Sequence, residues 1–310
     1  MVTCPGCNAK TFIPTDTPPL GISACKKCGS NIMMPLPLRQ FELRNLIGSG
    51  GMGTVYRAWD QILERYVAIK LIKPELSSVE NRQHFLSEAR ACASLNHTNI
   101  IQVHAYDEAD GYIYIVMELA ASGSLDQAIE KFTWIPELQV LDIGIKIAAA
   151  LDLALKHDLL HCDIKPGNIL FNEDHEPKLV DFGLSHKLGL PPETNDHTTG
   201  TPYYVAPEKI KRETETSLSD MYSLAATLYH AITGYVPFDG ATVDAIIEAQ
   251  VHTPLTPPNL VRTEITPHTS AALEKALSKN PADRFLSYDQ FIMSLEEARS
   301  LLLRTQNQSQ

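Results

Sequence analysis

A glycine-rich motif between two strand-type segments constrains the fold more than any other feature of this sequence. The stretch "GSGGMGTV" places glycine at positions 48, 50 and 53, in the spacing G-x-G-x-x-G. Bare glycines let backbone N–H groups approach phosphate oxygens without intervening side chains. A dinucleotide-binding fold would begin a helix directly after such a motif and place an acidic residue about twenty positions later. The residues that follow, "TVYRAWD", predict a strand instead, and this excludes the dinucleotide-binding fold.

The next strand carries a lysine on a face that is otherwise apolar. In "YVAIKLIK", Ala68, Lys70 and Ile72 point to one side, and the other side carries Val67, Ile69 and Leu71. A helix is expected next, and its apolar stripe consists of Phe85, Ala89, Cys92 and Leu95. Glu88 lies on the inward face of this helix, so a charge-assisted pair with Lys70 would hold the ammonium toward a phosphate. The alternative for each residue is an ordinary solvated charge.

The stretch "HCDIKPGN" (161–168) contains an aspartate, a lysine two residues later and an asparagine five residues later. "DFG" (181–183) follows thirteen residues after it. Phosphoryl transfer needs a carboxylate near the attacking hydroxyl and oxygen ligands for Mg²⁺. Asp163 fits the first role, and Asn168 and Asp181 fit the second. Lys165 can neutralise charge on the moving phosphoryl group.

Four cysteines form two Cys-x2-Cys pairs near the start of the chain, at Cys4, Cys7, Cys25 and Cys28. This spacing is typical of a four-thiolate metal site. Asn8 and Gly29 follow the pairs, and both residue types tolerate a left-handed backbone. Two disulfides or four unrelated thiols are the alternatives. Zn²⁺ is favoured over an iron centre that would use the same ligands, and the metal would supply much of the folding energy of so short a segment.

The charge distribution and the hydropathy of the chain argue against several classes of function. The net charge is −11 over 310 residues, and residues 1–40 carry four cations and one acidic residue. The remainder is therefore acidic, which argues against general nucleic-acid binding. There is no run of eighteen apolar residues and no hydrophobic leader, so neither a membrane span nor a secretory segment is expected. We expect a cytoplasmic protein, where thiols stay reduced.

In combination, these motifs resemble the catalytic domain of protein kinases over residues 41 to about 300. The glycine loop, Lys70 in "VAIK", Glu88, Asp163 with Asn168, "DFG" and "APE" (206–208) occur in the family's order. The stretches "GSGGMGTVYRAWD", "YIVMEL" and "GTPYYVAPE" are similar to bacterial Hanks-type, or eukaryotic-like, serine/threonine kinases. Residues 1–34 resemble the zinc-ribbon family.

The resemblance implies an α+β, bilobal protein-kinase fold preceded by a small zinc ribbon. The ribbon covers residues 1–34, and a proline-interrupted linker covers 35–40. A small β-rich N-lobe covers 41–117, a hinge 118–123 and a larger, mainly helical C-lobe 124–300. A polar tail is expected over 301–310, and its last six residues, "TQNQSQ", are expected to fray.

The resemblance also implies roles residue by residue, with ATP and Mg²⁺ (or Mn²⁺) as cofactors. Asp163, Lys165, Lys70, Glu88 and Thr201 would be catalytic, with Thr201 near Asp163 and Lys165. Glu208 would pair with Arg284, Asp220 would brace the catalytic loop, His161 would be a scaffold residue, and Cys92 would pack in the core. Met117 would be the gatekeeper, 118–120 the hinge that holds adenine, and Val55 and Ala68 would sandwich the ring. The implied nucleotide contacts are Ile47, Gly48, Ser49, Gly50, Gly51, Met52, Gly53, Val55, Ala68, Lys70, Met117, Glu118, Ala120, Asn168 and Asp181.

Position 162 departs from the family, because Cys162 replaces the usual arginine of His-Arg-Asp. That arginine helps to hold a phosphate on the activation segment, and a cysteine cannot make the forked contact. Phosphorylation at Thr198 or Thr199 is therefore expected to control activity weakly. A nucleophilic role for Cys162 is disfavoured by the adjacent Asp163 carboxylate, and a redox-sensing role is an alternative. Gly167 replaces an acidic residue that reads basic substrates in some relatives, so no basic consensus is inferred.

The resemblance implies a serine/threonine protein kinase that acts on protein substrates. The rival from another class is a pseudokinase, an ATP-binding scaffold that acts through its zinc ribbon, but none of Lys70, Asp163, Asn168 and Asp181 is lost. Small-molecule kinases share part of the spacing but generally lack "APE" and the Thr201 platform. The ribbon is either a docking or regulatory module for a protein partner or a capping element packed on the kinase. Its deletion is expected to leave basal phosphorylation largely intact.

Overall fold

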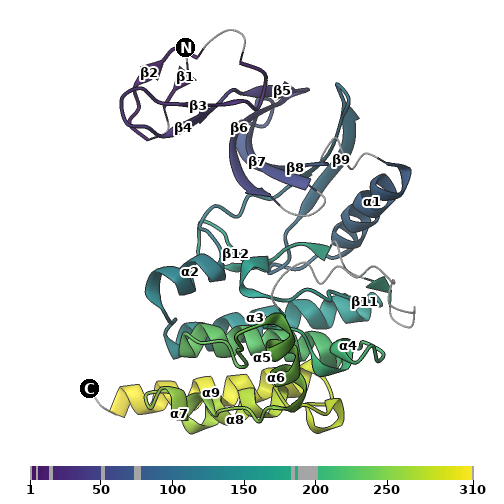
Figure 1. Cartoon of the computed structure of the whole chain (residues 1–310), viewed down its shortest axis with the longest axis vertical. Coiled ribbons are helices and arrows are strands. Elements are labelled where there is room, and N and C mark those ends of the chain that lie inside the picture. Colours follow the sequence, from purple (N-terminus) through teal and green to yellow (C-terminus); the bar gives the residue numbers. More distant parts are fainter. Residues whose placement is uncertain are drawn as a thin grey trace. The chain divides into compact units, whose positions relative to one another are not determined.

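The computed structural model describes residues 2–4, 6–13, 17–49, 53–72, 78–182, 186–187 and 202–308 (Figure 1). The chain divides into two compact units. The first comprises residues 1–93 and 102–119, and the second comprises residues 94–101 and 120–310.

The first unit begins with two antiparallel hairpins. β1 (Val2–Thr3) pairs with β2 (Lys10–Thr11), and β3 (Ile22–Ala24) pairs with β4 (Asn31–Met33). Asn8 and Gly29 have φ values of 55° and 76°, so each Cys-x2-Cys pair is followed by the expected left-handed residue. The hairpins share a small core of Cys4, Ile13, Cys25 and Ile32. So small a core stabilises little by apolar burial alone.

A six-stranded antiparallel sheet forms the rest of the first unit, together with one helix, α1 (Val79–Ser94). Its spatial order is β5-β6-β7-β8-β10-β9. The strand bounds are β5 (Leu36–Leu38), β6 (Phe41–Ser49), β7 (Gly53–Asp60), β8 (Arg65–Ile72), β9 (Val103–Ala109) and β10 (Tyr112–Met117). The strand predicted after the glycine motif is therefore confirmed as β7.

The two faces of this sheet bury different residues, as the alternation in β8 predicts. One face forms a cluster around Leu43, Val67, Ile69, Leu71 and Tyr114, here called the sheet cluster. The other face packs against α1 in a second cluster that consists of Ile72, Phe85, Ala89, Ile113 and Ile115. The four expected stripe residues of the helix segment, Cys92 included, are buried. Lys70 lies on the same face as Ile72, so it points toward the side of the sheet that α1 covers.

The segment 35–40, which the sequence predicts to be a linker, contributes an edge strand. In β5, Leu36 and Leu38 oppose Leu43 and Phe41 of β6, and both leucines are buried in the sheet cluster. Pro37 between them has no N–H to donate, which an edge strand tolerates. Met33 belongs to the same cluster and Leu20 packs against it, so ribbon and sheet share a core.

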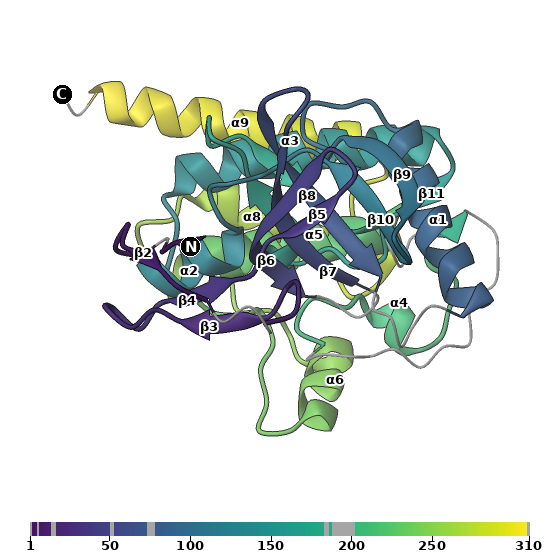
Figure 2. The same cartoon turned by 90° about the horizontal axis from the view of Figure 1, so that it is seen from above.

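The second unit is mainly helical. Within it, α3 lies alongside α5 and α9 (Figures 1 and 2). The longer helices are α2 (Leu125–Phe132), α3 (Glu137–Lys156), α5 (Ser217–Thr233), α6 (Val243–His252), α8 (Pro267–Ala276) and α9 (Tyr288–Gln308). The short elements are β11 (Leu159–Leu160), η2 (Pro166–Asn168), β12 (Ile169–Phe171), β13 (Pro177–Leu179), β14 (His186–Lys187), α4 (Pro207–Ile210), α7 (Pro258–Val261) and η4 (Pro281–Asp283).

Local signals explain where the central helix α5 begins and ends. The Thr216 hydroxyl caps its N-terminus by accepting from the Leu218 N–H, and the Thr216 N–H donates to the Ser219 hydroxyl in a capping box. Gly234 ends the helix with φ 82°, and an added Cβ there would lie 2.7 Å from the Thr133 carbonyl oxygen. Only glycine meets both conditions without strain.

The expected frayed tail is wrong for most of its length, because α9 continues to Gln308. Leu302 is buried and holds the helix past residue 301. Glutamine-rich sequence continues a helix at little cost. The predicted fold class is confirmed, with a β-rich N-terminal unit and a mainly helical second unit. Among the described residues, we find no helix with the length and apolar character that a membrane span requires.

Candidate functional site

Lys70 and Glu88 form the pair that the sequence predicts. Lys70 Nζ lies 2.5 Å from Glu88 Oε1, and both side chains are buried in the first unit. The ammonium also lies 5.9 Å from the centroid of the Phe85 ring on the same helix. A buried charge-assisted pair fixes the position of the lysine. Lys70 is therefore presented as a fixed cation on one face of the sheet.

The register of the sheet places the expected adenine-contacting residues around this lysine. Val55 on β7 lies opposite Lys70 on β8, and Met117 on β10 lies opposite Ala68. Directly opposed residues share one face of an antiparallel pair. The four side chains therefore line one continuous surface. Glu118 follows β10, and its N–H donates to the Gln102 carbonyl at 2.9 Å.

The glycines of the phosphate-loop motif differ in their surroundings. Ile47, Gly48 and Ser49 lie at the end of β6, and Gly50, Gly51 and Met52 lie outside the described residues. A Cβ added to Gly53 would lie 2.6 Å from the Leu71 carbonyl oxygen, a distance that real Cβ atoms do not tolerate. At Gly48 the nearest atom would be the Val55 Cβ, at 3.9 Å. Only the third glycine is required by the packing of the described strands.

In the second unit, Asp163 is the centre of a polar cluster. Lys165 Nζ lies 2.7 Å from Asp163 Oδ2. Asn168 Nδ2 donates to the same oxygen at 3.0 Å and to the Asp163 carbonyl at 2.8 Å. The carboxylate is half-buried rather than sealed, so it can meet a substrate hydroxyl. The structure thus brings together three residues that the sequence predicts as functional.

The residues around this cluster hold the loop that contains Asp163, as the sequence predicts. The Asp220 carboxylate accepts the N–H groups of His161 at 2.7 Å and Cys162 at 2.8 Å. Burial raises the pKa of Asp220, although the two N–H donors and His161 act in the opposite direction. The Asp163 N–H donates to His161 Nδ1, so Nε2 carries the ring proton and donates to the Val180 carbonyl at 3.0 Å. His161 is therefore a fully buried scaffold residue, and the brace by Asp220 is confirmed.

The expected Mg²⁺ ligands lie at one end of the β12–β13 hairpin. Ile169 pairs with Leu179, and the Val180 N–H donates to the Asn168 carbonyl at 3.0 Å. Asn168 uses its Nδ2 atom on Asp163, which leaves Oδ1 as the acceptor for a ligand. Asp181 comes directly after this pair, with an exposed side chain. Amide and carboxylate oxygens are the donor types that Mg²⁺ prefers. Thr198, Thr199 and Thr201 lie outside the described residues.

A buried ion pair anchors the "APE" segment. Arg284 donates two parallel hydrogen bonds to Glu208, at 2.7 and 2.8 Å, as the sequence predicts. Ser219 donates to the same carboxylate at 2.7 Å. Burial alone would raise the pKa of Glu208, but the arginine and the serine hydroxyl more than offset it, so the pKa is lowered. The pair therefore stays ionised at neutral pH.

Two further residues make polar contacts that the sequence does not predict. Lys209 Nζ donates to the Cys162 carbonyl at 3.0 Å. The fully buried Gln250 on α6 donates to the carbonyls of Pro202 and Tyr203, directly after Thr201. Neither residue belongs to a motif or a periodic pattern, so the sequence holds no signal for them.

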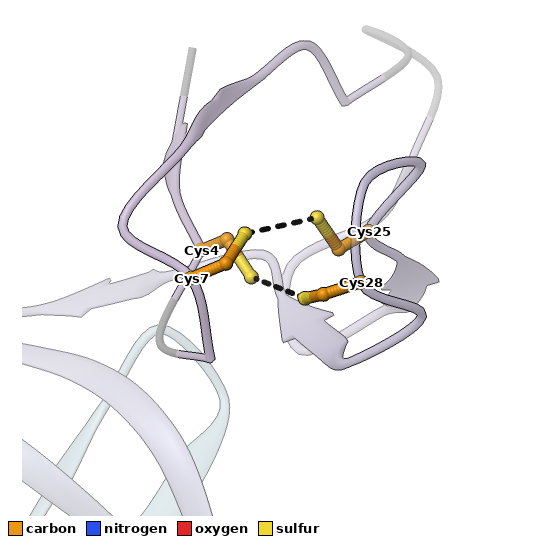
Figure 3. A group of neighbouring side chains, drawn as sticks. All are labelled: Cys4, Cys7, Cys25 and Cys28. Atoms are coloured by element: carbon orange, nitrogen blue, oxygen red, sulfur yellow. Dashed lines mark hydrogen bonds between the residues drawn. The ribbon is translucent and has the colours of Figure 1, made fainter.

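The four cysteines of the ribbon converge on one point (Figure 3). Their Sγ atoms all lie within 4.8 Å of one another, with Cys4 and Cys28 at 3.5 Å and Cys7 and Cys25 at 3.8 Å. Tetrahedral Zn²⁺ with Zn–S bonds of about 2.3 Å sets its sulfur atoms about 3.8 Å apart. The predicted clustering is confirmed, and the set fits a structural zinc ion. All four are free thiols, which excludes the disulfide alternative.

The local backbone favours thiolates in the second Cys-x2-Cys pair of this cluster. Backbone N–H groups of Lys27 and Cys28 lower the pKa of Cys25 to about 6. The Ser30 hydroxyl and N–H lower the pKa of Cys28. Because metals bind the thiolate form, these donors prepare the second Cys-x2-Cys pair for a cation.

Comparison with known proteins assigns residues 41–294 to the protein kinase domain family. Serine/threonine-protein kinase PksC of Streptomyces coelicolor is 36% identical over 260 residues, which cover 80% of this chain and 47% of that protein. The probable serine/threonine-protein kinase CPE1738 of Clostridium perfringens is 33% identical over 264 residues, covering 84% of this chain and 38% of that protein. Serine/threonine-protein kinase PknK of Mycobacterium tuberculosis is 36% identical over 257 residues, which cover 82% of this chain and 23% of that protein. The chain thus spans less than half the length of these relatives.

Proposed function

This chain belongs to the protein kinase family, and we propose that it transfers the γ-phosphoryl group of ATP to serine or threonine hydroxyls of proteins. The observation that carries the proposal is the cluster of Asp163, Lys165 and Asn168, together with the separately fixed Lys70–Glu88 pair. These groups offer a base, cations and a metal ligand, which are the parts that phosphoryl transfer requires.

Each residue of the cluster has a distinct proposed task. Asp163 accepts the proton of the attacking hydroxyl, and Asn168 holds the carboxylate in place through its Nδ2 atom. Lys165, already 2.7 Å from Asp163, neutralises charge on the transferred group. Lys70, fixed by Glu88, binds the α- and β-phosphates. Mg²⁺, when bound, would neutralise phosphate charge, with Asn168 Oδ1 and Asp181 as its ligands.

Lys165 also bears on the class of acceptor. By the family resemblance, a lysine at this position is typical of serine/threonine kinases rather than tyrosine kinases. The curated relatives carry serine/threonine-protein kinase in their names. We therefore propose Ser/Thr hydroxyls of proteins as acceptors, rather than tyrosine or small molecules.

The test is radiolabel transfer from γ-labelled ATP to a generic protein substrate and a Ser/Thr peptide library. Asp163→Ala is expected to lower incorporation by a factor of about 10²–10⁴, the usual contribution of a general base. Asp174→Ala, in the exposed turn after β12, is the matched control and should retain wild-type transfer. Equal incorporation by Asp163→Ala and wild type would contradict the mechanism.

Two alternatives give different results in the same assay. A pseudokinase scaffold would bind Mg²⁺-ATP without transferring label to any protein, so a nucleotide-binding measurement accompanies the assay. A small-molecule kinase would label low-mass acceptors but not the peptide library. Phosphoamino acid analysis of labelled protein would separate serine and threonine from tyrosine.

We also propose that this is a non-RD kinase, since Cys162 stands in place of arginine before Asp163. A cysteine offers no charged fork for a phosphate on the activation segment. Substitution of both Thr198 and Thr199 by alanine should then leave turnover largely unchanged. A collapse in rate would refute weak phosphorylation control without touching the assignment as a kinase.

For the ribbon, we propose one structural zinc ion per chain and a cytoplasmic setting. Four metal-binding thiols persist most readily in a reducing compartment. Its net charge gives little attraction to nucleic acid, so a protein partner is proposed instead. Cell fractionation tests the compartment, and recovery of the protein with the periplasmic or membrane fraction would count against it.

A further inference from the structure

The two peptide groups that flank Cys162 are held by different helices. The Cys162 N–H donates to Asp220 Oδ1 at 2.8 Å, and Asp220 belongs to α5. The Cys162 carbonyl accepts from the Lys209 ammonium at 3.0 Å, and Lys209 belongs to α4. The residue directly before Asp163 is therefore clamped on both sides.

The backbone of Cys162 needs such a clamp. Its φ is +66°, in the left-handed region that favours glycine and that a cysteine enters only at a cost. A conformation of this kind persists where the surroundings enforce it, and it often occurs at functional sites. If the carbonyl were released, the peptide between Cys162 and Asp163 could rotate, and the Asp163 carboxylate would turn away from its position.

Lys209 is fixed as a charged group beside this carbonyl. Its ammonium lies 3.0 Å from Glu215 Oε2, and the Glu215 side chain is only 8% exposed. Burial alone would lower the pKa of Lys209, but the Glu215 carboxylate and other nearby groups raise it overall. The neighbouring residue, Glu208, is tied to Arg284 by two hydrogen bonds. The lysine is therefore charged, and the backbone of α4 next to it is anchored by the Glu208–Arg284 pair.

We infer that Lys209 is a positioning residue that holds the catalytic loop in its working conformation through the Cys162 carbonyl. This cation reaches the loop from α4 rather than from position 162, and its carboxylate partner, Glu215, lies within the described chain. The clamp is thus complete without a phosphate on the activation segment. The inference rests on the proposed kinase function, because it gives Lys209 the task of aligning Asp163 for phosphoryl transfer.

A purely structural role for Lys209 makes a different prediction. If its ion pair with Glu215 only stabilised α4, loss of the ammonium would lower the melting temperature and leave kcat of the folded enzyme unchanged. A positioning role lowers kcat while KM for ATP stays constant, since no described contact of Lys209 reaches a residue proposed to bind the nucleotide. The split between kcat and KM therefore separates the two roles.

The first experiment compares Lys209→Met with Lys209→Arg and with Lys211→Met. We expect Lys209→Met to lower kcat about tenfold, as misplacement of a catalytic group by a fraction of an ångström does, with KM for ATP within about twofold of wild type. Lys209→Arg keeps a cation at the carbonyl and should retain most of the rate. Lys211→Met, at an exposed position just after α4, should match wild type.

The second experiment asks whether the backbone strain at Cys162 is the cause of the loss. Glycine adopts a positive φ without penalty, so Cys162→Gly should make the clamp less necessary. The double variant Cys162→Gly, Lys209→Met should recover kcat to within about threefold of Cys162→Gly alone, a difference worth less than 1 kcal/mol. If Lys209 acted only by anchoring α4, glycine at position 162 could not restore kcat in the double variant. A full tenfold loss that persists in the double variant would overturn the inference.

A third measurement does not depend on catalysis. Cys162 is itself a probe, because a loosened loop exposes its thiol, and mass spectrometry can follow alkylation at this residue alone. Lys209→Met should alkylate several-fold faster at Cys162 than wild type below its melting transition. Unchanged alkylation together with unchanged kcat would overturn the inference. An inactive wild type whose Lys209→Met variant still alkylates faster would refute the proposed function and leave the clamp standing.

Discussion

Gly48 and Gly53 occupy the first and last positions of one motif, but their surroundings differ. An added Cβ at Gly53 would lie 2.6 Å from the Leu71 carbonyl oxygen and 3.1 Å from the Lys70 Cγ atom. At Gly48 it would lie 3.9 Å from its nearest neighbour, an ordinary contact. The motif thus combines a glycine that the strand packing requires with one that it does not.

We expect Gly53→Ala to lower the free energy of unfolding by about 1–3 kcal/mol, the usual cost of overpacking a well-packed site. Gly48→Ala should be close to neutral, since alanine adds no clash and reduces the freedom of the unfolded chain. Urea unfolding of both variants checks this. Equal destabilisation of the two would show that the close approach to β8 is not the cause.

The sequence predicts single residues well where a motif links them. Lys70 and Glu88 follow from strand alternation and a helix stripe, and Glu208 with Arg284 follows from the family pattern. The Lys209–Cys162 contact is different, because it joins a lysine side chain to a backbone carbonyl 47 positions away. Every residue has a backbone carbonyl, so neither residue type nor spacing in the sequence predicts which carbonyl the lysine contacts. The same holds for Gln250 and the carbonyls after Thr201.

At the scale of elements, the four-residue helix α4 is too short to be stable by itself and depends on its anchors. Glu208 within α4 binds Arg284 after η4 and Ser219 in α5, so three elements meet at one carboxylate. Loss of one partner from such a buried pair leaves an uncompensated charge in a poorly solvated site. The anchor therefore stabilises the fold only when both the glutamate and the arginine are present.

Arg284→Met should lower the free energy of unfolding by about 3–5 kcal/mol at neutral pH, the usual cost of breaking a buried pair. Because the folded-state pKa of Glu208 is lowered, the pair stabilises the fold above the ordinary carboxyl pKa. That contribution is lost as the pH falls through the lowered value. The difference between wild type and Glu208→Gln should therefore shrink in acid. Urea unfolding across pH measures it, and a difference that stays constant would contradict the assignment.

Elements with a strong period were predictable, whereas those decided by tertiary packing were not. The helix with the stripe of Phe85, Ala89, Cys92 and Leu95 and the alternation of β8 follow from apolar spacing alone. β5 was not expected, because prolines at 35 and 37 indicate a connector and only the edge position in the sheet makes Pro37 acceptable. The segment "TQNQSQ" at the end of the chain indicates a polar, frayed tail, yet α9, with Leu302 buried, continues to Gln308.

At the scale of the whole molecule, the ribbon has a small apolar core and one cluster of four cysteines that fits a metal ion. Its core consists of four small or medium residues, two of them cysteines, and cannot offset much chain entropy. Metal binding supplies folding free energy in domains of this kind. We therefore expect the four thiols, with a bound metal, to stabilise the ribbon.

We expect one equivalent of zinc per chain by elemental analysis, and Cys25→Ser to abolish it and lower the melting temperature. Cys162→Ser is the matched control, because Cys162 lies outside the four-thiol cluster and should keep the metal. A strong chelator should reproduce the effect of Cys25→Ser on wild type only. Full zinc content in Cys25→Ser would refute the four-ligand site.

The ribbon and the sheet share one core, and this bears on the two roles considered for the ribbon. Met33 lies in the sheet cluster with Leu43 and Ile69, and Leu20 packs against it. A docking module on a flexible tether would not bury its own residues in this way. The packing favours a capping element.

Removal of residues 1–34 separates these roles. The truncated chain loses Leu20 and Met33 from the sheet cluster, so its free energy of unfolding should fall by about 2–4 kcal/mol, the value of one to two buried apolar side chains. Basal phosphoryl transfer at low temperature should persist, since Lys70, Glu88 and Asp163 keep their described contacts. Thermal melting and the transfer assay, with full-length Cys25→Ser as the control, measure both effects. An unchanged melting temperature would make the ribbon an independent docking module, because a capping element cannot be removed without exposing the cluster that it covers.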